Sequence, residues 1–316
     1  MIKTDILIIG AGPTGLFAVF EAGLLKMNCH ILDSLTQPGG QLTELYPRKP
    51  IYDIPGYPEI IAGDLIENLL EQIKPFSPSY TLGETAQGIE KIDDGSFIVS
   101  TDKKTKINAS VIAIAGGLGT FTPRKPNISN ISDYEENGVL YMIKNPDDFR
   151  DKNVLIAGGG DSALDWTIHL SDIAKKVTLV HRRKELRAEK ILQSRLINKS
   201  NIEILWEKKV EEFLGDGLGV NGLKLSSTKD SSSSEIEVDG VFVAIGHDPS
   251  TAIFKDKIKL DKDNYVITDK GGTNTSVPGI FAAGDCVDKI YRQAVTAAGM
   301  GCMAALDAEK WLAEKK

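Results

Sequence analysis

The sequence predicts an α/β protein built from two similar units, with the second inserted into the first. Two glycine-rich turns support this prediction, because each directly follows an apolar strand-like run and precedes a helix-like segment. The third observation is an apolar run at residues 280–283 that leads into Gly284 and Asp285, well after the second unit has closed. Backbone N–H groups at such turns can face an anionic phosphate pair. Both units are therefore expected to be Rossmann-like dinucleotide-binding domains.

The domain boundaries follow from Gly/Pro-rich stretches between the apolar runs. Residues 1–117 form the first part of one domain and close on an apolar strand. Residues 118–246 form the second domain, and residues 247–316 return to the first one, which is therefore discontinuous. The two crossings would act as a double hinge.

The first glycine-rich turn occupies residues 10–15 (Gly-Ala-Gly-Pro-Thr-Gly), after an apolar run at residues 5–9. The next strand, at residues 29–32, leads to Asp33, which lies 23 positions after Gly10. A carboxylate at this place accepts hydrogen bonds from ribose hydroxyls and repels a 2′-phosphate. We therefore expect the first domain to bind FAD, with NAD as the alternative.

The second turn occupies residues 158–163 (Gly-Gly-Gly-Asp-Ser-Ala), again after an apolar run. The same offset, counted from its first glycine, reaches His181 and no carboxylate. Three arginines follow, namely Arg182, Arg183 and Arg187. Planar guanidinium groups suit a phosphate dianion, so the second domain is expected to bind NADPH.

The composition narrows the class of protein. The chain has 316 residues with a formal net charge of −7, which argues against nucleic acid or an anionic membrane as a partner. The N-terminus runs directly into a strand, and no apolar stretch is long enough to span a bilayer, so a cytoplasmic location is expected. Three isolated cysteines, Cys29, Cys286 and Cys302, indicate neither a disulfide framework nor a metal site.

The C-terminal part carries a third signal. A carboxylate at Asp285, directly after an apolar strand, suits the ribityl and pyrophosphate oxygens of FAD. Residues 292–294 (Arg-Gln-Ala) open the last helix, expected at residues 295–312. Their backbone N–H groups could stabilise negative charge at the pyrimidine end of a reduced flavin.

With these motifs, the chain resembles the low-molecular-weight thioredoxin reductase family of flavoproteins over essentially its whole length. The most specific stretches are residues 39–42, 180–183, 281–285, 290–294 and 301–306. The resemblance implies a homodimer that contains FAD and uses NADPH.

One feature of that family is missing. Thioredoxin reductases carry a Cys-x-x-Cys pair in the NADPH domain, but the corresponding stretch, residues 138–145, contains no cysteine. Without this pair, the flavin cannot reduce a protein disulfide through the usual dithiol relay. A sister branch, the thioredoxin-reductase-like ferredoxin (flavodoxin)–NADP⁺ reductases, lacks the pair. The chain resembles this branch at residues 44–47, 51–58, 62–65, 122–125 and 158–166.

This second resemblance has one implication and one departure. It implies that Tyr46 stacks on the flavin ring. Members of that branch carry a C-terminal extension over the other flavin face, whereas this sequence ends at residues 311–316 as thioredoxin reductases do. How that face is covered, and which acceptor reaches it, is therefore left open.

The motifs and the resemblance together assign the candidate site residues. Those for FAD are Gly10, Gly12, Pro13, Thr14, Gly15, Asp33, Gly40, Gln41, Tyr46, Asp53, Gly284, Asp285, Arg292, Gln293 and Ala294. Those for NADPH are Gly158, Gly160, Asp161, Ser162, Ala163, His181, Arg182, Arg183 and Arg187. No side chain is expected to act as a general acid or base, because a hydride passes directly from NADPH to the flavin.

Three functions follow from these assignments. The leading one is an enzyme that passes electrons from NADPH through FAD to a one-electron carrier, ferredoxin or flavodoxin. Such carriers are usually acidic and would need a basic surface. The candidates for it are Lys175, Lys176, Arg182, Arg183, Lys184, Arg187, Lys190, Arg195 and Lys199. The alternatives are a disulfide or low-molecular-weight-thiol reductase that relies on a lone cysteine, Cys286 first, and a non-enzymatic NADP(H)/FAD redox sensor.

Overall fold

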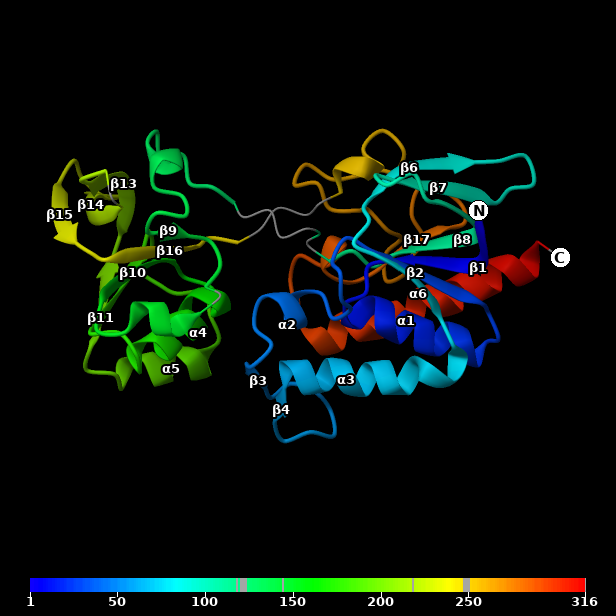
Figure 1. Ribbon diagram of the computed structural model, residues 1–316, viewed down its shortest axis with the longest axis horizontal. Coiled ribbons are helices and arrows are strands. Elements are labelled where there is room, and N and C mark those ends of the chain that lie inside the picture. Colours follow the sequence, from blue (N-terminus) through cyan, green and yellow to red (C-terminus); the bar gives the residue numbers. More distant parts are fainter. Residues whose placement is uncertain (118, 120–123, 144, 218, 247–250, 316) are drawn as a thin grey trace. The chain divides into compact units, whose positions relative to one another are not determined.

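The structure is a computed structural model that describes residues 1–117, 119, 124–143, 145–217, 219–246 and 251–315 (Figure 1). The chain divides into two compact units. Unit 1 comprises Met1–Thr122 and Asp248–Lys316, and unit 2 comprises Pro123–His247. The boundaries expected at 117–118 and 246–247 each include a residue outside the described part of the chain, so their exact positions stay predictions.

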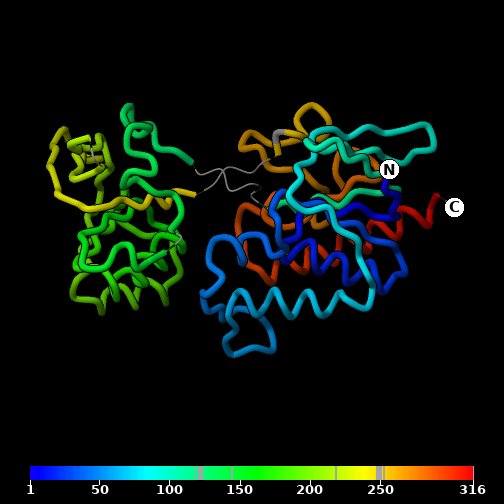
Figure 2. Tube along the Cα trace, in the orientation of Figure 1, coloured from blue at the N-terminus to red at the C-terminus, as the bar shows by residue number. Residues whose placement is uncertain are grey.

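Unit 1 is organised around a seven-stranded sheet in the order β5-β2-β1-β8-β7-β6, with β17 added on β8. Its parallel strands are β1 (Ile2–Ile9), β2 (Cys29–Asp33), β5 (Ser79–Leu82), β8 (Lys106–Ile114) and β17 (Ile280–Ala282). The antiparallel strands are β6 (Ala86–Lys91) and β7 (Phe97–Thr101). The strand β17 comes from the C-terminal segment, so the sheet joins both parts of the interrupted domain (Figure 2).

Three long helices cover one face of this sheet: α1 (Pro13–Leu24), α3 (Ala62–Ile73) and α6 (Ala294–Glu314) (Figure 1). The shorter elements of unit 1 are α2 (Gln41–Glu44), β3 (Pro50–Ile51), β4 (Ile60–Ile61), η1 (Lys74–Phe76), η4 (Ala252–Phe254) and η5 (Gly284–Cys286). Helix α6 extends beyond the expected range of 295–312 at both ends. Its earlier start follows from Gln293, which is the N-cap.

Small residues let α1 and α6 approach closely. Gly301, Ala304, Ala305 and Ala308 of α6 are buried. A Cβ on Gly301 would lie 2.1 Å from the carbonyl oxygen of Thr14 in α1. The packing of α6 therefore brings the C-terminal helix directly against the helix that follows the first glycine-rich turn.

Unit 2 contains a five-stranded parallel sheet in the order β12-β11-β10-β16-β9 and a separate antiparallel sheet, β13-β14-β15. The parallel strands are β9 (Val139–Leu140), β10 (Asn153–Gly158), β11 (Lys176–His181), β12 (Ile202–Trp206) and β16 (Gly240–Ala244). The antiparallel strands are β13 (Lys208–Gly215), β14 (Val220–Ser227) and β15 (Ser233–Glu237). The helices are α4 (Asp161–Ser171) and α5 (Lys190–Ile197), with η2 (Ile131–Asp133) and η3 (Pro146–Phe149).

Both units therefore show the parallel strand–turn–helix arrangement of a Rossmann-like domain, which confirms the predicted fold class. Within the described residues, no helix combines the length and the apolar character needed to cross a bilayer.

Candidate functional site

The first glycine-rich turn joins β1 to α1 in unit 1. Gly10 has a φ of +117°, and a Cβ on it would lie 2.3 Å from the carbonyl oxygen of Ala115 in the neighbouring chain segment. A Cβ on Gly15 would lie 1.9 Å from the carbonyl oxygen of Gly10. Gly12 is the N-cap of α1, and Pro13 follows it, so no side chain caps this helix. The turn thus leaves the N-terminal end of α1 open to an anion.

Asp33 lies at the end of β2, beside this turn. Its carboxylate accepts hydrogen bonds from the backbone N–H of Ala11 at 2.5 Å and of Leu35 at 2.8 Å. Burial raises the pKa of Asp33, and these backbone donors oppose that shift. The carboxylate therefore lies where the sequence offset predicts it, held against the turn that precedes α1.

Residues from three distant parts of the sequence meet at the same end of the sheet. The Gln41 side chain donates a hydrogen bond of 3.3 Å to the carboxylate of Asp285, although the two are 244 positions apart. Gly284 has a φ of +77°, and a Cβ on it would lie 2.4 Å from the hydroxyl of Thr14. The next turn packs here as well, because a Cβ on Gly40 would lie 3.1 Å from the Cα of Gly12.

This end of the sheet therefore gathers Thr14, Gly40, Gln41, Gly284 and Asp285 around the start of α1. Burial raises the pKa of Asp285, while Gln41 and the charge of Arg292 oppose the shift. A cradle of glycines with a polar amide and a carboxylate fits the pyrophosphate and ribityl groups of FAD.

Two other candidate residues follow α2. Tyr46 is half-buried and packs against the core of unit 1, with the Nζ of Lys49 5.4 Å from its ring centroid. Asp53 is exposed on the segment between β3 and β4. Stacking of Tyr46 on a flavin and binding of FAD by Asp53 both stay predictions.

The start of α6 is fixed by a capping box. The Gln293 side chain accepts a hydrogen bond from the backbone N–H of Thr296, and the Thr296 hydroxyl accepts one of 3.3 Å from the backbone N–H of Gln293. The first-turn amide of Ala294 has no acceptor within the helix. It is therefore oriented along the helix axis, at the positive end of the helix dipole.

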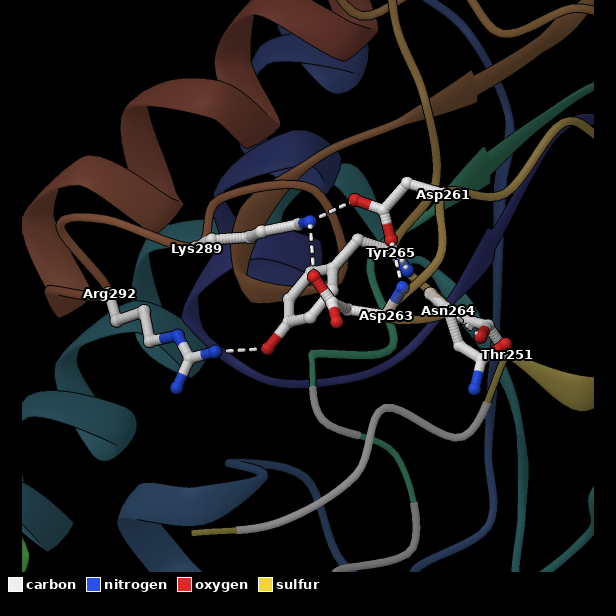
Figure 3. A network of polar contacts seen from close by, with 7 residues as sticks. All are labelled: Thr251, Asp261, Asp263, Asn264, Tyr265, Lys289 and Arg292. Atoms are coloured by element: carbon white, nitrogen blue, oxygen red, sulfur yellow. Dashed lines mark hydrogen bonds and ion pairs between the residues drawn. The ribbon is translucent and has the colours of Figure 1, made fainter.

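Arg292 precedes this cap with a φ of +52°, and its guanidinium donates a hydrogen bond to the hydroxyl of Tyr265 (Figure 3). The Tyr265 ring also lies under the Nζ of Lys289, which is 4.9 Å from the ring centroid. Lys289 pairs with Asp261 and, at 3.2 Å, with Asp263. The Asp261 carboxylate raises the pKa of Lys289. Tyr265 is not predictable as a partner from the sequence, because nothing in the 27-residue separation indicates that Arg292 points toward it.

The second glycine-rich turn joins β10 to α4 in unit 2. A Cβ on Gly158 would lie 2.6 Å from the carbonyl oxygen of Ala244, and Gly160 is the N-cap of α4 without a side-chain cap. Asp161 and Ser162 are exposed in the first turn, while Ala163 is buried. Like the first turn, this one leads into a helix N-terminus without a side-chain cap. It differs in carrying Asp161 in the first turn of α4, whose carboxylate accepts a hydrogen bond of 2.8 Å from the backbone N–H of Glu189.

His181, at the end of β11, points into the protein. Its side chain is buried, with Nδ1 2.9 Å from the carbonyl oxygen of Gly158 and Nε2 3.0 Å from that of Glu185. A Cβ on Gly159 would lie 2.2 Å from the ring. The sequence offset correctly located the end of the strand, but it gave no information on the direction of this side chain.

The arginines after His181 are exposed. An open hollow of about 280 Å³ is lined by Arg183, Lys184, Glu185, Leu186 and Arg187. The backbone N–H of Arg187 donates a hydrogen bond of 2.8 Å to the carbonyl oxygen of Gly159, so this loop returns to the glycine-rich turn. The hydroxyl of Thr228 donates a hydrogen bond of 3.2 Å to the carbonyl oxygen of Arg182. No sequence motif indicates this contact. Exposed guanidinium groups beside an open helix N-terminus fit a nucleotide with an additional phosphate.

A model of the family "pyridine nucleotide-disulphide oxidoreductase" matches residues 4–301. The chain belongs to this family. The match includes both glycine-rich turns, Asp285 and the loop that carries the arginines.

Several relatives in sequence are named ferredoxin–NADP reductases. A ferredoxin–NADP reductase of Flavobacterium johnsoniae is 52% identical over 295 residues, which cover 90% of this chain and 82% of that protein. One of Mesorhizobium japonicum is 43% identical over 297 residues, covering 90% of this chain and 83% of that protein. The solved structure of Lactococcus lactis thioredoxin reductase matches with a TM-score of 0.91 and 31% identity, covering 99% of this chain and 100% of that one. These likenesses confirm the predicted branch, the oxidoreductase class and the FAD and NADPH cofactor pair.

The three cysteines of this family member are separate from one another. Cys286 is buried, and its thiol donates to the carbonyl oxygen of Ala283 at 3.2 Å. Burial raises the pKa of both Cys286 and Cys29 to about 12. Cys302 is half-buried, and its thiol donates to a carboxylate oxygen of Glu21 at 3.4 Å. Buried thiols that stay protonated are poor nucleophiles, which weakens the hypothesis of a disulfide reductase working through Cys286.

The expected basic surface is partly neutralised. Lys176 forms an ion pair of 2.7 Å with Glu203, and Lys199 pairs with Asp172. Both pairs are partly exposed to solvent, so dissolved salt screens the attraction within each pair. Whether this surface binds a partner stays a prediction.

Proposed function

We propose that this chain is an NADPH-dependent reductase of a one-electron carrier, ferredoxin or flavodoxin, and that it acts as a cytoplasmic homodimer. Unit 1 would hold FAD and unit 2 would hold NADPH. The choice of acceptor rests on the relatives named ferredoxin–NADP reductase, together with the burial of Cys29 and Cys286 and the lack of a Cys-x-x-Cys pair in the sequence.

The residues of unit 1 fit FAD. Gly10, Gly15 and Gly284 allow the turn to pack tightly against its own neighbours, because a Cβ on each would collide with protein atoms. At Gly12 a Cβ would meet only the Cα of Gly40, at 3.9 Å, so this is the glycine that would let the backbone approach a pyrophosphate closely. Asp33 would accept hydrogen bonds from ribose hydroxyls, and Asp285 with Gln41 would bind the ribityl and pyrophosphate region. The N-terminus of α6 would stabilise negative charge on the flavin.

The residues of unit 2 fit NADPH. The start of α4 would bind the pyrophosphate through backbone N–H groups, as a helix N-terminus favours anions. Arg182, Arg183 and Arg187 would bind the 2′-phosphate as charge-assisted donors. The second unit has His181 and not a carboxylate at the position of Asp33, so the residue at the strand end does not repel a 2′-phosphate as Asp33 would.

When bound, FAD would accept a hydride from NADPH and release the two electrons one at a time. This is needed because NADPH donates electrons in pairs, whereas ferredoxin or flavodoxin accepts one at a time. The part of this chain is positioning and electrostatics. Its glycine turns hold two nucleotides, its arginines select the phosphorylated one, and its buried thiols stay outside the electron path.

The test uses the FAD-loaded protein with NADPH and two acceptors in parallel. One assay couples ferredoxin or flavodoxin to cytochrome c reduction, and the other offers thioredoxin with a disulfide reporter. Turnover with the carrier alone supports the proposal, whereas turnover with thioredoxin alone contradicts it. Binding of both nucleotides without turnover in either assay would favour the redox sensor. Sedimentation equilibrium tests the homodimer, and cell fractionation tests the location.

A further inference from the structure

One imidazole joins the two loops that surround the candidate nucleotide site in unit 2. The Nδ1 of His181 is 2.9 Å from the carbonyl oxygen of Gly158, in the glycine-rich turn. Its Nε2 is 3.0 Å from the carbonyl oxygen of Glu185, in the loop that carries Arg182, Arg183 and Arg187. His181 is 5% exposed, so both contacts are shielded from water.

The chemistry of the two contacts is directional. A carbonyl oxygen only accepts hydrogen bonds, so each contact is a hydrogen bond only when the ring nitrogen in it carries a proton. A neutral imidazole donates to one loop, and an imidazolium donates to both. Each nitrogen therefore serves a different loop, and the two contacts can be separated by substitution.

Two further observations concern the contact between the glycine-rich turn and the arginine loop. A Cβ on Gly159 would lie 2.2 Å from both the Cε1 and the Nδ1 of His181, so the middle glycine of the turn leaves the space that the ring fills. The backbone N–H of Arg187 donates to the carbonyl oxygen of Gly159 at 2.8 Å. The arginine loop is thus attached to the glycine-rich turn through this backbone hydrogen bond as well as through the ring of His181.

We propose that His181 is a positioning residue that sets the arginine loop against the glycine-rich turn and thereby contributes to the preference for NADPH over NADH, without contacting the nucleotide. The inference rests on the proposed function, because it takes unit 2 as the NADPH domain. The Glu185 contact would govern the 2′-phosphate, and the Gly158 contact would govern the pyrophosphate that both nucleotides share.

Two variants separate the contacts. Asparagine carries its amide nitrogen at the position of Nδ1, so His181→Asn keeps the bond to Gly158 and loses the one to Glu185. Glutamine carries its amide nitrogen at the position of Nε2, so His181→Gln keeps the bond to Glu185 and loses the one to Gly158. Titration calorimetry of the FAD-loaded protein with NADP⁺ and with NAD⁺ measures each dissociation constant.

For His181→Asn, we expect the dissociation constant of NADP⁺ to rise about tenfold, because one buried hydrogen bond is lost, while that of NAD⁺ changes less than about twofold. For His181→Gln, both constants should rise by a similar factor, so the ratio stays as in the parent protein. Steady-state kinetics should show these effects in KM, with kcat for NADPH nearly unchanged.

The matched control is His169→Asn, since His169 is an exposed histidine on the adjoining helix α4. It should leave both constants and their ratio unchanged. The inference is overturned if His181→Asn leaves the ratio of the NADP⁺ and NAD⁺ dissociation constants unchanged. It is also overturned if both His181 variants weaken the preference for NADP⁺ equally. A parent protein that binds NADP⁺ and NAD⁺ equally would instead contradict the proposed NADPH site, and the inference with it. If one variant does not fold, the ratio measured with the other still decides.

Discussion

Gly159 and His181 are packed so closely that only a glycine fits under the imidazole. A Cβ at residue 159 would lie 2.2 Å from the ring, well inside van der Waals contact. The ring cannot easily move aside, because it is buried and each of its nitrogens lies within 3.0 Å of a backbone carbonyl oxygen. The ring of His181 is therefore one reason why residue 159 is a glycine, in addition to any space that a bound phosphate needs.

The first prediction follows from this contact. Gly159→Ala should lower the free energy of unfolding of the nucleotide-free protein by about 2–3 kcal/mol, because overpacking displaces the ring or the turn. Urea unfolding followed by circular dichroism measures it. In the control, Gly160→Ala, the new Cβ has no heavy atom within 4 Å, and the loss should stay below about 1 kcal/mol from the changed N-cap. Equal losses in the two variants would show that the ring does yield.

The second prediction concerns the arginine loop. Arg182→Ala combined with Arg183→Ala should raise the KM for NADPH strongly and leave the use of NADH little changed. The loss of charge-assisted phosphate contacts should cost about 2–4 kcal/mol of binding free energy. Steady-state kinetics with both nucleotides checks this. The control is Lys176→Ala, which removes an exposed cation that is already paired with Glu203. An equal loss with NADPH and NADH would refute the 2′-phosphate assignment.

Much of the candidate site follows from local sequence patterns. Local patterns locate the two glycine turns, Asp33 and Asp285, because each lies at or just after the end of a buried strand. The carboxyl ends of parallel strands lie at one edge of the sheet, so these residues are expected there. The pairing of Gln41 with Asp285 could not be predicted in this way, since it depends on β17 joining the sheet beside β8 from the far end of the chain.

Side-chain direction is the other limit. The offset that predicts a ligand at His181 locates the end of β11, but the ring turns toward two backbone carbonyls that no spacing rule identifies. Arg292 is a similar case, because its neighbours in sequence indicate the start of a helix while its guanidinium contacts Tyr265. Both directions come from packing between segments that are distant in sequence.

The third prediction is that the thiols of Cys29 and Cys286 are unreactive in the folded protein. At pH 8, a thiol with a pKa of about 12 is ionised in only about one molecule in ten thousand, so Cys29 and Cys286 should resist iodoacetamide in the folded protein. At higher pH, labelling should increase only when the pH comes close to that pKa or when the protein unfolds. Mass spectrometry with and without urea measures labelling. Replacement of all three cysteines by alanine should leave carrier-coupled NADPH oxidation within about twofold if no thiol lies on the electron path. Loss of that activity in a folded, FAD-loaded triple variant would bring back a cysteine-based mechanism.

The last prediction tests the packing that attaches the C-terminal helix to the first glycine-rich turn. Two glycines of α6, Gly299 and Gly301, lie two residues apart and should respond with opposite signs to alanine. A Cβ on Gly301 would lie 2.1 Å from the Thr14 carbonyl oxygen, so Gly301→Ala must separate α6 from α1 and should destabilise the protein by about 2–3 kcal/mol.

At Gly299, by contrast, a Cβ has no heavy atom within 4 Å, and alanine is the better helix former. Gly299→Ala should therefore stabilise the protein by up to about 1 kcal/mol. Thermal unfolding of both variants, with FAD retention read from the visible spectrum, separates the two effects. Because Thr14 also lies against Gly284 beside Asp285, Gly301→Ala should release FAD more readily than Gly299→Ala does. Equal FAD retention in two variants of such different stability would show that the α1–α6 contact does not support the flavin site.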